Sequence, residues 1–288
     1  MSDEPLFNTT EQNNKNYLFF PVFEFPVKFE DRYKRMHDIN THKCLVRPWD
    51  NNGSIEPKQL AIVGKTYKVI QNKELFAKID REMVDTLPNE IQEGMYTVDS
   101  TAGYGATCYR EYICPSYRIP QTDEDIRFRL IVRNGFGGTS LQVIGGAIDF
   151  FCTNGLITGT YDRAYYRHTK GLVVSKIGDA VNQCVKDYLK LGDDITYMQS
   201  RKPKPIDEVK EWLKEHGISE RASNKITERL LQEKRDRGNN LWAIYSALTN
   251  WATHEAVRST GNDHERNTIH NRQVKVSNLG QMIHELEE

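Results

Sequence analysis

Hydrophobic and polar residues alternate most clearly over residues 126–133, which read IRFRLIVR. A period of two predicts a β-strand with one face in a hydrophobic core. The turn-forming segment NGFGG at 134–138 follows, and the apolar run at 139–151 then predicts a second strand. We therefore expect a long β-hairpin whose first strand carries a basic face, formed by Arg127, Arg129 and Arg133.

Helical periodicity accounts for most of the remaining apolar positions. Residues 72–87 carry one apolar stripe, begin at the capping residue Asn72 and end before Pro88, which predicts a helix. Residues 259–276 are polar and predict a loop. Further helices are predicted, with apolar stripes of the same kind, at 175–192, 207–216, 219–237, 240–258 and around 279–286.

These patterns predict an α+β protein, in which an antiparallel sheet with a long β-hairpin is flanked by helices and followed by a mostly helical C-terminal part. The polar residues 1–16 are expected to form a flexible N-terminal arm, and residues 17–200 an α+β nucleic-acid-binding core. The stiff basic segment RKPKP at 201–205 marks the boundary to a helical C-terminal region, 201–288.

The aromatic segment at 17–26 contains two prolines, which favour an edge strand or an extended clip. Such a segment packs either on its own domain or on a neighbouring subunit. Packing on its own domain is favoured, because apolar segments bury against the nearest core.

Composition is that of an ordinary soluble protein, with 38% hydrophobic residues, 27% charged residues and a net charge of -1. No apolar run is long enough to cross a bilayer as a helix. Five scattered cysteines without a Cys-x-x-Cys pair argue against a zinc ribbon and favour a reducing compartment. We expect a cytoplasmic protein, in the host cytoplasm if a phage encodes it, that does not associate with membranes.

Positive charge is concentrated in one part of the chain, although the total is balanced. Residues 126–176 contain seven Lys/Arg and two Asp, a local net charge of +5 (7 − 2). Tyrosines interleave with these bases at 161–170, which is typical of proteins that place cations on phosphates and aromatic rings on single-stranded bases. The candidate nucleic-acid-binding residues are Arg127, Arg129, Arg133, Arg163, Tyr165, Tyr166, Arg167, His168, Lys170 and Lys176. The alternative is a solvated strand face with the tyrosines in the core, which a half-exposed antiparallel strand would also produce.

Other chemistries find weaker support. The glycine-rich turn at 134–138 lacks the Lys-Ser/Thr of a phosphate-binding loop, so ATP hydrolysis is not expected. A Cys152–His168 pair is the best candidate for nucleophilic catalysis, but the apolar neighbours of Cys152 predict an inert, buried thiol. Three histidines could gather a metal but do not follow the spacing of known zinc sites: His254, His264 and His270. We therefore expect no enzyme activity, no cofactor and no metal.

Several motifs occur in an order that resembles a phage- and plasmid-borne family of unassigned function, over about residues 65–275. They are YKVIQNKELF at 67–76, NGFGG at 134–138, CTNGL at 152–156, RHT at 167–169 and LWAIYSALTNW at 241–251. The turn at 134–138 departs from that family, which usually carries a polar residue and Asp before the glycine, where this chain has Gly135-Phe136. Distant similarity links the family to the single-strand annealing recombinases of phages, such as RecT and Red-beta, and to their eukaryotic counterparts. The resemblance implies an α+β domain that assembles into rings or filaments and holds single-stranded DNA in a basic groove without ATP.

The leading hypothesis is therefore an ATP-independent single-stranded DNA-binding and annealing protein of phage recombination, acting as a homo-oligomer. An alternative is a protein-interaction or host-defence-countering module, in which the same basic patch binds an acidic partner. The salt dependence of nucleic-acid binding distinguishes the two hypotheses.

Overall fold

The main sheet is built around four antiparallel strands that follow one another along the chain. The computed structural model describes residues 8–10, 18–51, 54–119, 125–149, 154–157, 164–166, 176–257 and 265–288. The four strands are β5 (Tyr96–Ala102), β6 (Thr107–Arg118), β7 (Ile126–Gly135) and β8 (Leu141–Asp149). The β7–β8 hairpin and its turn confirm the prediction from the alternation at 126–133.

Three short strands extend this sheet at its two edges. At one edge, β1 (Asn8–Thr10) pairs in parallel with β5. At the other edge, β9 (Asn154–Ile157) and β10 (Ala164–Tyr166) both pair antiparallel with β8. The strand order is therefore β1-β5-β6-β7-β8-β10, with β9 beside β8.

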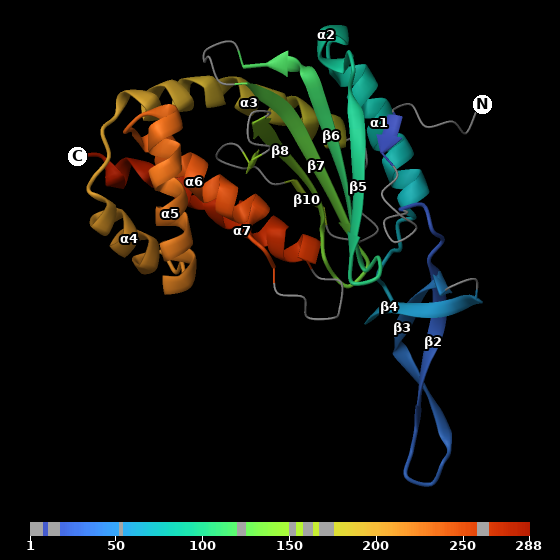
Figure 1. Cartoon of the computed structure of the whole chain (residues 1–288). Helices are drawn as coiled ribbons and strands as arrows, with labels where there is room; N and C mark the ends of the chain where they lie inside the picture. The colour runs from blue at the N-terminus through green and yellow to red at the C-terminus, as the bar shows by residue number, and fades with distance from the viewer. Residues whose placement is uncertain are drawn as a thin grey trace.

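One face of the main sheet packs against α1 (Asn72–Thr86) and α3 (Lys176–Ser200), as Figure 1 shows. Four β7 side chains are buried on this face, as the alternation predicts: Ile126, Phe128, Leu130 and Val132. Helix α3 approaches β8 so closely that a Cβ atom on Gly145 would lie 2.8 Å from the Cβ of Cys184. The glycine is therefore needed for close contact between helix and sheet.

Helix α1 begins one residue away from the predicted cap. Gln71 is the N-cap, and Asn72 is the first helical residue. The buried Asn72 side chain donates to the carbonyl of Leu18 at 2.8 Å and accepts from Asn134 Nδ2 at 2.7 Å. Asn72 therefore links the N-terminal segment, α1 and β7 instead of capping the helix.

The C-terminal part is mostly helical, which confirms the predicted fold class. Its elements are α4 (Ile206–Glu215), α5 (Glu220–Arg237), α6 (Leu241–His254), α7 (Glu265–Gln281) and the 3-10 helix η2 (Ile283–Leu286). The short helix α2 (Asn89–Gln92) follows α1 in the N-terminal part. None of the described helices is both long enough and apolar enough to cross a membrane.

Three predictions of helix extent were wrong: the helix predicted at 240–258 is α6, which ends at His254, and the other two concern α7 and α3. The loop predicted at 259–276 is largely helix α7, whose buried face includes the polar residues His270, Gln273 and Ser277. A polar buried face gives no apolar periodicity, so the sequence pattern does not indicate it. Helix α3 continues beyond Gly192 to Ser200, because Ile195 and Met198 are buried in the core.

A second sheet of three antiparallel strands precedes α1 and was not predicted. It consists of β2 (Phe23–Glu30), β3 (Met36–Asn51) and β4 (Ser54–Gly64) in the order β2-β3-β4. Figure 1 shows the β2–β3 hairpin, here called the finger, projecting from the molecule on the side away from α4. Of the aromatic segment at 17–26, residues 18–22 are buried in the chain's own core through Leu18, Phe20 and Val22, which confirms packing on its own domain for that part, whereas Phe23 and Phe25 lie exposed on β2.

Candidate nucleic-acid interface

The basic face of β7 lies opposite α1 and α3, as predicted, but α7 covers part of it. Tyr109 of β6 donates from its hydroxyl to Asn267 Oδ1 of α7 at 2.5 Å. The Tyr109 ring also lies 5.3 Å from that of His270, between centroids. The arginine face is therefore only partly open to solvent within the described residues.

Arg129 is held in a buried ion-pair cluster. Its Nε lies 2.7 Å and its Nη2 2.6 Å from Glu111 Oε2, and the residue is 4% exposed. Arg266 of α7 donates to the other Glu111 oxygen. Burial alone would raise the pKa of Glu111, but the two guanidiniums hold it below the ordinary value. Arg129 therefore stabilises the fold, and its charge is already compensated.

Arg127 has a partner that solvent reaches. Its Nη2 lies 2.6 Å from Asp125 Oδ1, and the Asp125 side chain is 45% exposed. An exposed ion pair contributes little to stability, so a phosphate could replace the carboxylate at small cost.

Arg133 lies beside an aromatic ring. Its guanidinium carbon is 5.8 Å from the centroid of Tyr109, and that of Arg266 is 4.5 Å from the same ring. Among the residues that the structure describes, no carboxylate lies within ion-pair distance of Arg133. Burial raises the pKa of Tyr109 against the pull of both guanidiniums, so its hydroxyl stays protonated.

The register of the sheet brings part of the tyrosine-rich segment to the same place. Tyr165 of β10 pairs with Gln142 of β8, which pairs with Arg133 of β7, which pairs with Tyr109 of β6. Residues paired across antiparallel strands belong to one row of the sheet. We call these four residues the edge row. Tyr166 pairs with Leu141 and belongs to the neighbouring row.

The structure describes only one of the remaining predicted residues. Lys176 is the first residue of α3. Arg163, Arg167, His168 and Lys170 are outside the residues that the structure describes.

The family model for a domain of unknown function, DUF932, matches residues 59–275. The chain belongs to this family. No curated protein and no solved structure gives a significant match. The resemblance to a family of unassigned function is thereby confirmed, whereas its link to annealing recombinases stays a prediction.

The sequence analysis does not predict two features of the structure, the contacts of Arg266 and the finger. Arg266 and its contacts depend on α7, which lies in a segment predicted as loop. The whole finger precedes residue 59, where the DUF932 match begins, and its strand β2 has no buried positions. The alternation FEFPVKFE at 23–30 and the density of aromatic and basic residues could have indicated it.

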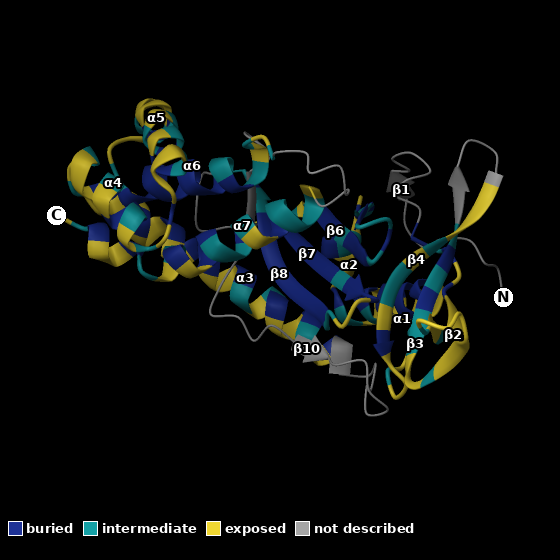
Figure 2. Cartoon of the chain, turned by 90° about the horizontal axis from the view of Figure 1, so that it is seen from below, coloured by how far each residue is buried: buried dark blue, intermediate teal, exposed yellow. Residues whose placement is uncertain are grey.

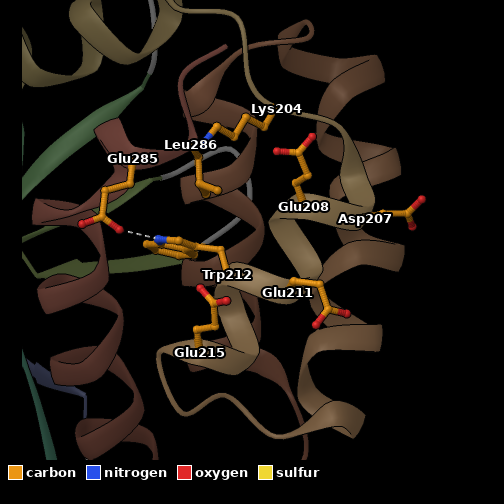
Figure 3. A pocket seen from close by; sticks show the side chains of 8 residues that line it. All are labelled: Lys204, Asp207, Glu208, Glu211, Trp212, Glu215, Glu285 and Leu286. Atoms are coloured by element: carbon orange, nitrogen blue, oxygen red, sulfur yellow. Dashed lines mark hydrogen bonds between the residues drawn. The ribbon is translucent and has the colours of Figure 1, made fainter.

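A pocket of about 370 Å³ beside α4 has the opposite charge (Figure 3). Its walls carry five carboxylates, one lysine and two apolar side chains: Asp207, Glu208, Glu211, Glu215, Glu285, Lys204, Trp212 and Leu286. Trp212 Nε1 donates to Glu285 at 2.7 Å. An acidic wall repels phosphates, so this pocket does not serve as a nucleic-acid site.

Three of the four described cysteines are buried, unreactive thiols, and the described residues hold no candidate metal cluster. Burial raises the pKa of the Cys108, Cys114 and Cys184 thiols to about 12, so they are inert at neutral pH. Among the described residues, no group of three or more His, Cys, Asp or Glu side chains could hold a metal ion. Cys152, His168 and His264 lie outside those residues.

Proposed function

We propose that the protein binds single-stranded DNA along the edge row of its main sheet and anneals it to a complementary strand without ATP. The observation that carries the proposal is the register that aligns Tyr165, Gln142, Arg133 and Tyr109 across four strands. Tyr109 is buried under α7, so the row offers phosphate contact through Arg133, and Tyr165 of the edge strand β10 is the candidate for base stacking.

The charges on this face support the proposal. Four arginines, at positions 127, 129, 133 and 266, share two carboxylates, Asp125 and Glu111. The excess of positive charge belongs to the accessible members, Arg127 and Arg133, because Arg129 is buried against Glu111. A phosphate backbone supplies the missing negative charge.

Annealing follows from binding of this kind. A protein that holds one strand by its phosphates and separates its bases lowers the ordering cost of pairing with a second strand. No nucleotide hydrolysis is required, because duplex formation itself is favourable. Assembly into a homo-oligomer, as the resemblance to annealing recombinases implies, would place several such rows along one strand.

The test is fluorescence anisotropy of a labelled single-stranded oligonucleotide at increasing salt, with the variant Arg127→Gln/Arg133→Gln. Each lost phosphate contact lowers the slope of log affinity against log salt by about 0.7, so the double variant should lose about 1.4. Lys190→Gln is the control, because Lys190 lies on α3 at the other face of the sheet with a side chain that is 74% exposed. An annealing assay with complementary strands follows for each variant.

Two outcomes would overturn the proposal. The first is an absence of binding at low salt, which would direct the search to an acidic protein partner. The second is a double variant with the affinity and salt slope of the wild type.

A further inference from the structure

The finger exposes aromatic side chains that no other part of the described structure covers. Phe23, Phe25 and Phe29 are each 51% exposed, and they occupy alternate positions of β2 around Val27. Beyond its pairing with β3, β2 makes no more than marginal contact with other described elements. Figure 2 shows this strand exposed while the strands of the main sheet are buried. Large apolar groups gathered on an exposed face indicate a binding surface.

The tip of the finger adds cations to this aromatic face. Tyr33 is 63% exposed, and the guanidinium carbons of Arg32 and Arg35 lie 4.7 and 5.2 Å from its ring centroid. Residues 28–38 contain four Lys/Arg and three Asp/Glu, a net charge of +1 (4 − 3) without His37, and Lys28 pairs with Asp38 at 3.3 Å. His37 stacks on Phe29 with ring centroids 5.1 Å apart.

Asp31 fixes the shape of this tip. Its carboxylate accepts from the backbone N–H groups of Tyr33 at 2.8 Å and Arg35 at 3.0 Å. It also accepts from Arg35 Nε and contacts His37 Nε2, both at 2.9 Å. Asp31 is thus engaged within the turn, and the tyrosine is presented in a preorganised position.

We infer that the finger is a stacking platform for the unpaired bases of single-stranded nucleic acid, with Phe25, Phe29 and Tyr33 as the stacking residues. The inference rests on the proposed function, since it takes the same ligand, but it uses different residues. Every base has a π-face, so recognition of this kind tolerates any sequence. Phe25 and Phe29 are four residues apart on β2, a separation of about 13.6 Å at 3.4 Å per residue, which is about four base steps at the stacked rise of 3.4 Å.

A nucleic acid fits this face better than a second copy of the chain. The other large exposed apolar side chains of the described residues outside the three-stranded sheet are spread over three helices: Val84, Leu189, Tyr197 and Leu231. Because they are dispersed, these side chains do not form an apolar patch on which the finger of a second copy could dock. The surplus of cations at the tip is complementary to phosphates.

The experiment uses the full chain and two labelled oligonucleotides of equal length, one of thymidines and one in which abasic sites replace the bases. The variant Phe25→Ala/Phe29→Ala removes two stacking faces without changing charge. It should bind the thymidine oligonucleotide roughly 10- to 100-fold more weakly and the abasic one with unchanged affinity. Phe25→Tyr/Phe29→Tyr should bind both as the wild type does. Leu231→Ala is the matched control, an exposed apolar residue on α5.

The same design separates this inference from the proposed function. Arg127→Gln/Arg133→Gln removes phosphate contacts and should weaken binding to both oligonucleotides, so its failure would concern the edge row alone. The inference about the finger is overturned if the alanine variant binds thymidines like the wild type, or loses affinity equally for both ligands. It is also overturned if sedimentation shows that the alanine variant changes the oligomeric state with DNA binding intact, since a second copy would then cover the finger. Circular dichroism verifies that each variant is folded.

Discussion

Arg237, the last residue of α5, donates from Nη2 to Asp149 Oδ2 at the end of β8, at 2.6 Å. Both side chains are buried, and Arg237 also donates from Nε to Glu233 at 2.8 Å. The two ion-paired residues belong to the helical C-terminal part and to the main sheet, so the pair ties these parts together. Asp149 therefore serves the fold.

Replacing Arg237 with Met should lower the free energy of unfolding by about 3–5 kcal/mol, because two buried carboxylates lose this partner. Arg229→Met is the matched control. Arg229 also pairs with Glu233, but its side chain is 35% exposed, so its loss should cost about 1 kcal/mol or less. Urea unfolding followed by circular dichroism measures both. Equal losses would contradict a structural role for the Arg237–Asp149 pair.

The arginines of β7 should separate into a stability class and a binding class. Arg129→Gln should destabilise the protein by about 3 kcal/mol, since it breaks a buried pair with Glu111. Arg133→Gln should change stability by about 0.5 kcal/mol or less, while weakening oligonucleotide binding. Thermal unfolding and fluorescence anisotropy of both variants test this division. The reverse pattern, with a stable Arg129 variant, would show that the Glu111 cluster does not hold the sheet to α7.

The sequence pattern predicts which residues of β7 face the core, but not which residues pair with its arginines. Alternation at 126–133 identified the buried residues of β7, because one face of the strand packs on α1 and α3. The same alternation could not show that Glu111 and Arg266 compensate Arg129, since these residues come from β6 and α7. Contacts between distant segments leave no mark in local periodicity.

The finger was missed for a related physical reason. Apolar and polar residues alternate at 23–30, but Pro26 argues against a strand inside a sheet, and the apolar positions are exposed rather than buried in a core. Helix α7 was missed because its buried positions include His270 and Gln273. Period-based reasoning finds elements that bury apolar stripes, whereas β2 exposes its apolar residues and α7 buries polar ones.

The Glu111 cluster also predicts a pH dependence. The pKa of Glu111 is lower in the folded than in the unfolded chain, because Arg129 and Arg266 outweigh the effect of burial. Its contribution to stability is therefore fully present above the unfolded pKa and is lost as pH falls through the folded value. The difference in unfolding free energy between wild type and Glu111→Gln should be largest near neutral pH and shrink below about pH 4. A difference that is constant with pH would contradict an ionised Glu111 in the cluster.

Gly145→Ala should destabilise the protein by about 1–3 kcal/mol. The new methyl group would lie 3.1 Å from the Cα of Cys184, a backbone atom of α3 that cannot rotate away. Gly64→Ala is the control, since a Cβ there meets nothing within 4 Å. Differential scanning calorimetry should show a lowered melting temperature for the first variant and almost none for the second. Similar shifts for both would mean that α3 does not pack closely on β8.

The turn of the finger should be resistant to acid. Hydrogen bonds from His37 and from the backbone of Arg35 lower the pKa of Asp31 from 3.8 to about 2. Because the folded pKa is depressed, the turn retains this stabilisation above the unfolded pKa and loses it only as pH falls through about 2. Carboxyl carbon chemical shifts measured by NMR should give that midpoint, with Asp31→Asn assigning the signal. If Asp31 titrates at its ordinary value, the turn is not held in this way, and Tyr33 is not presented in a fixed position for stacking.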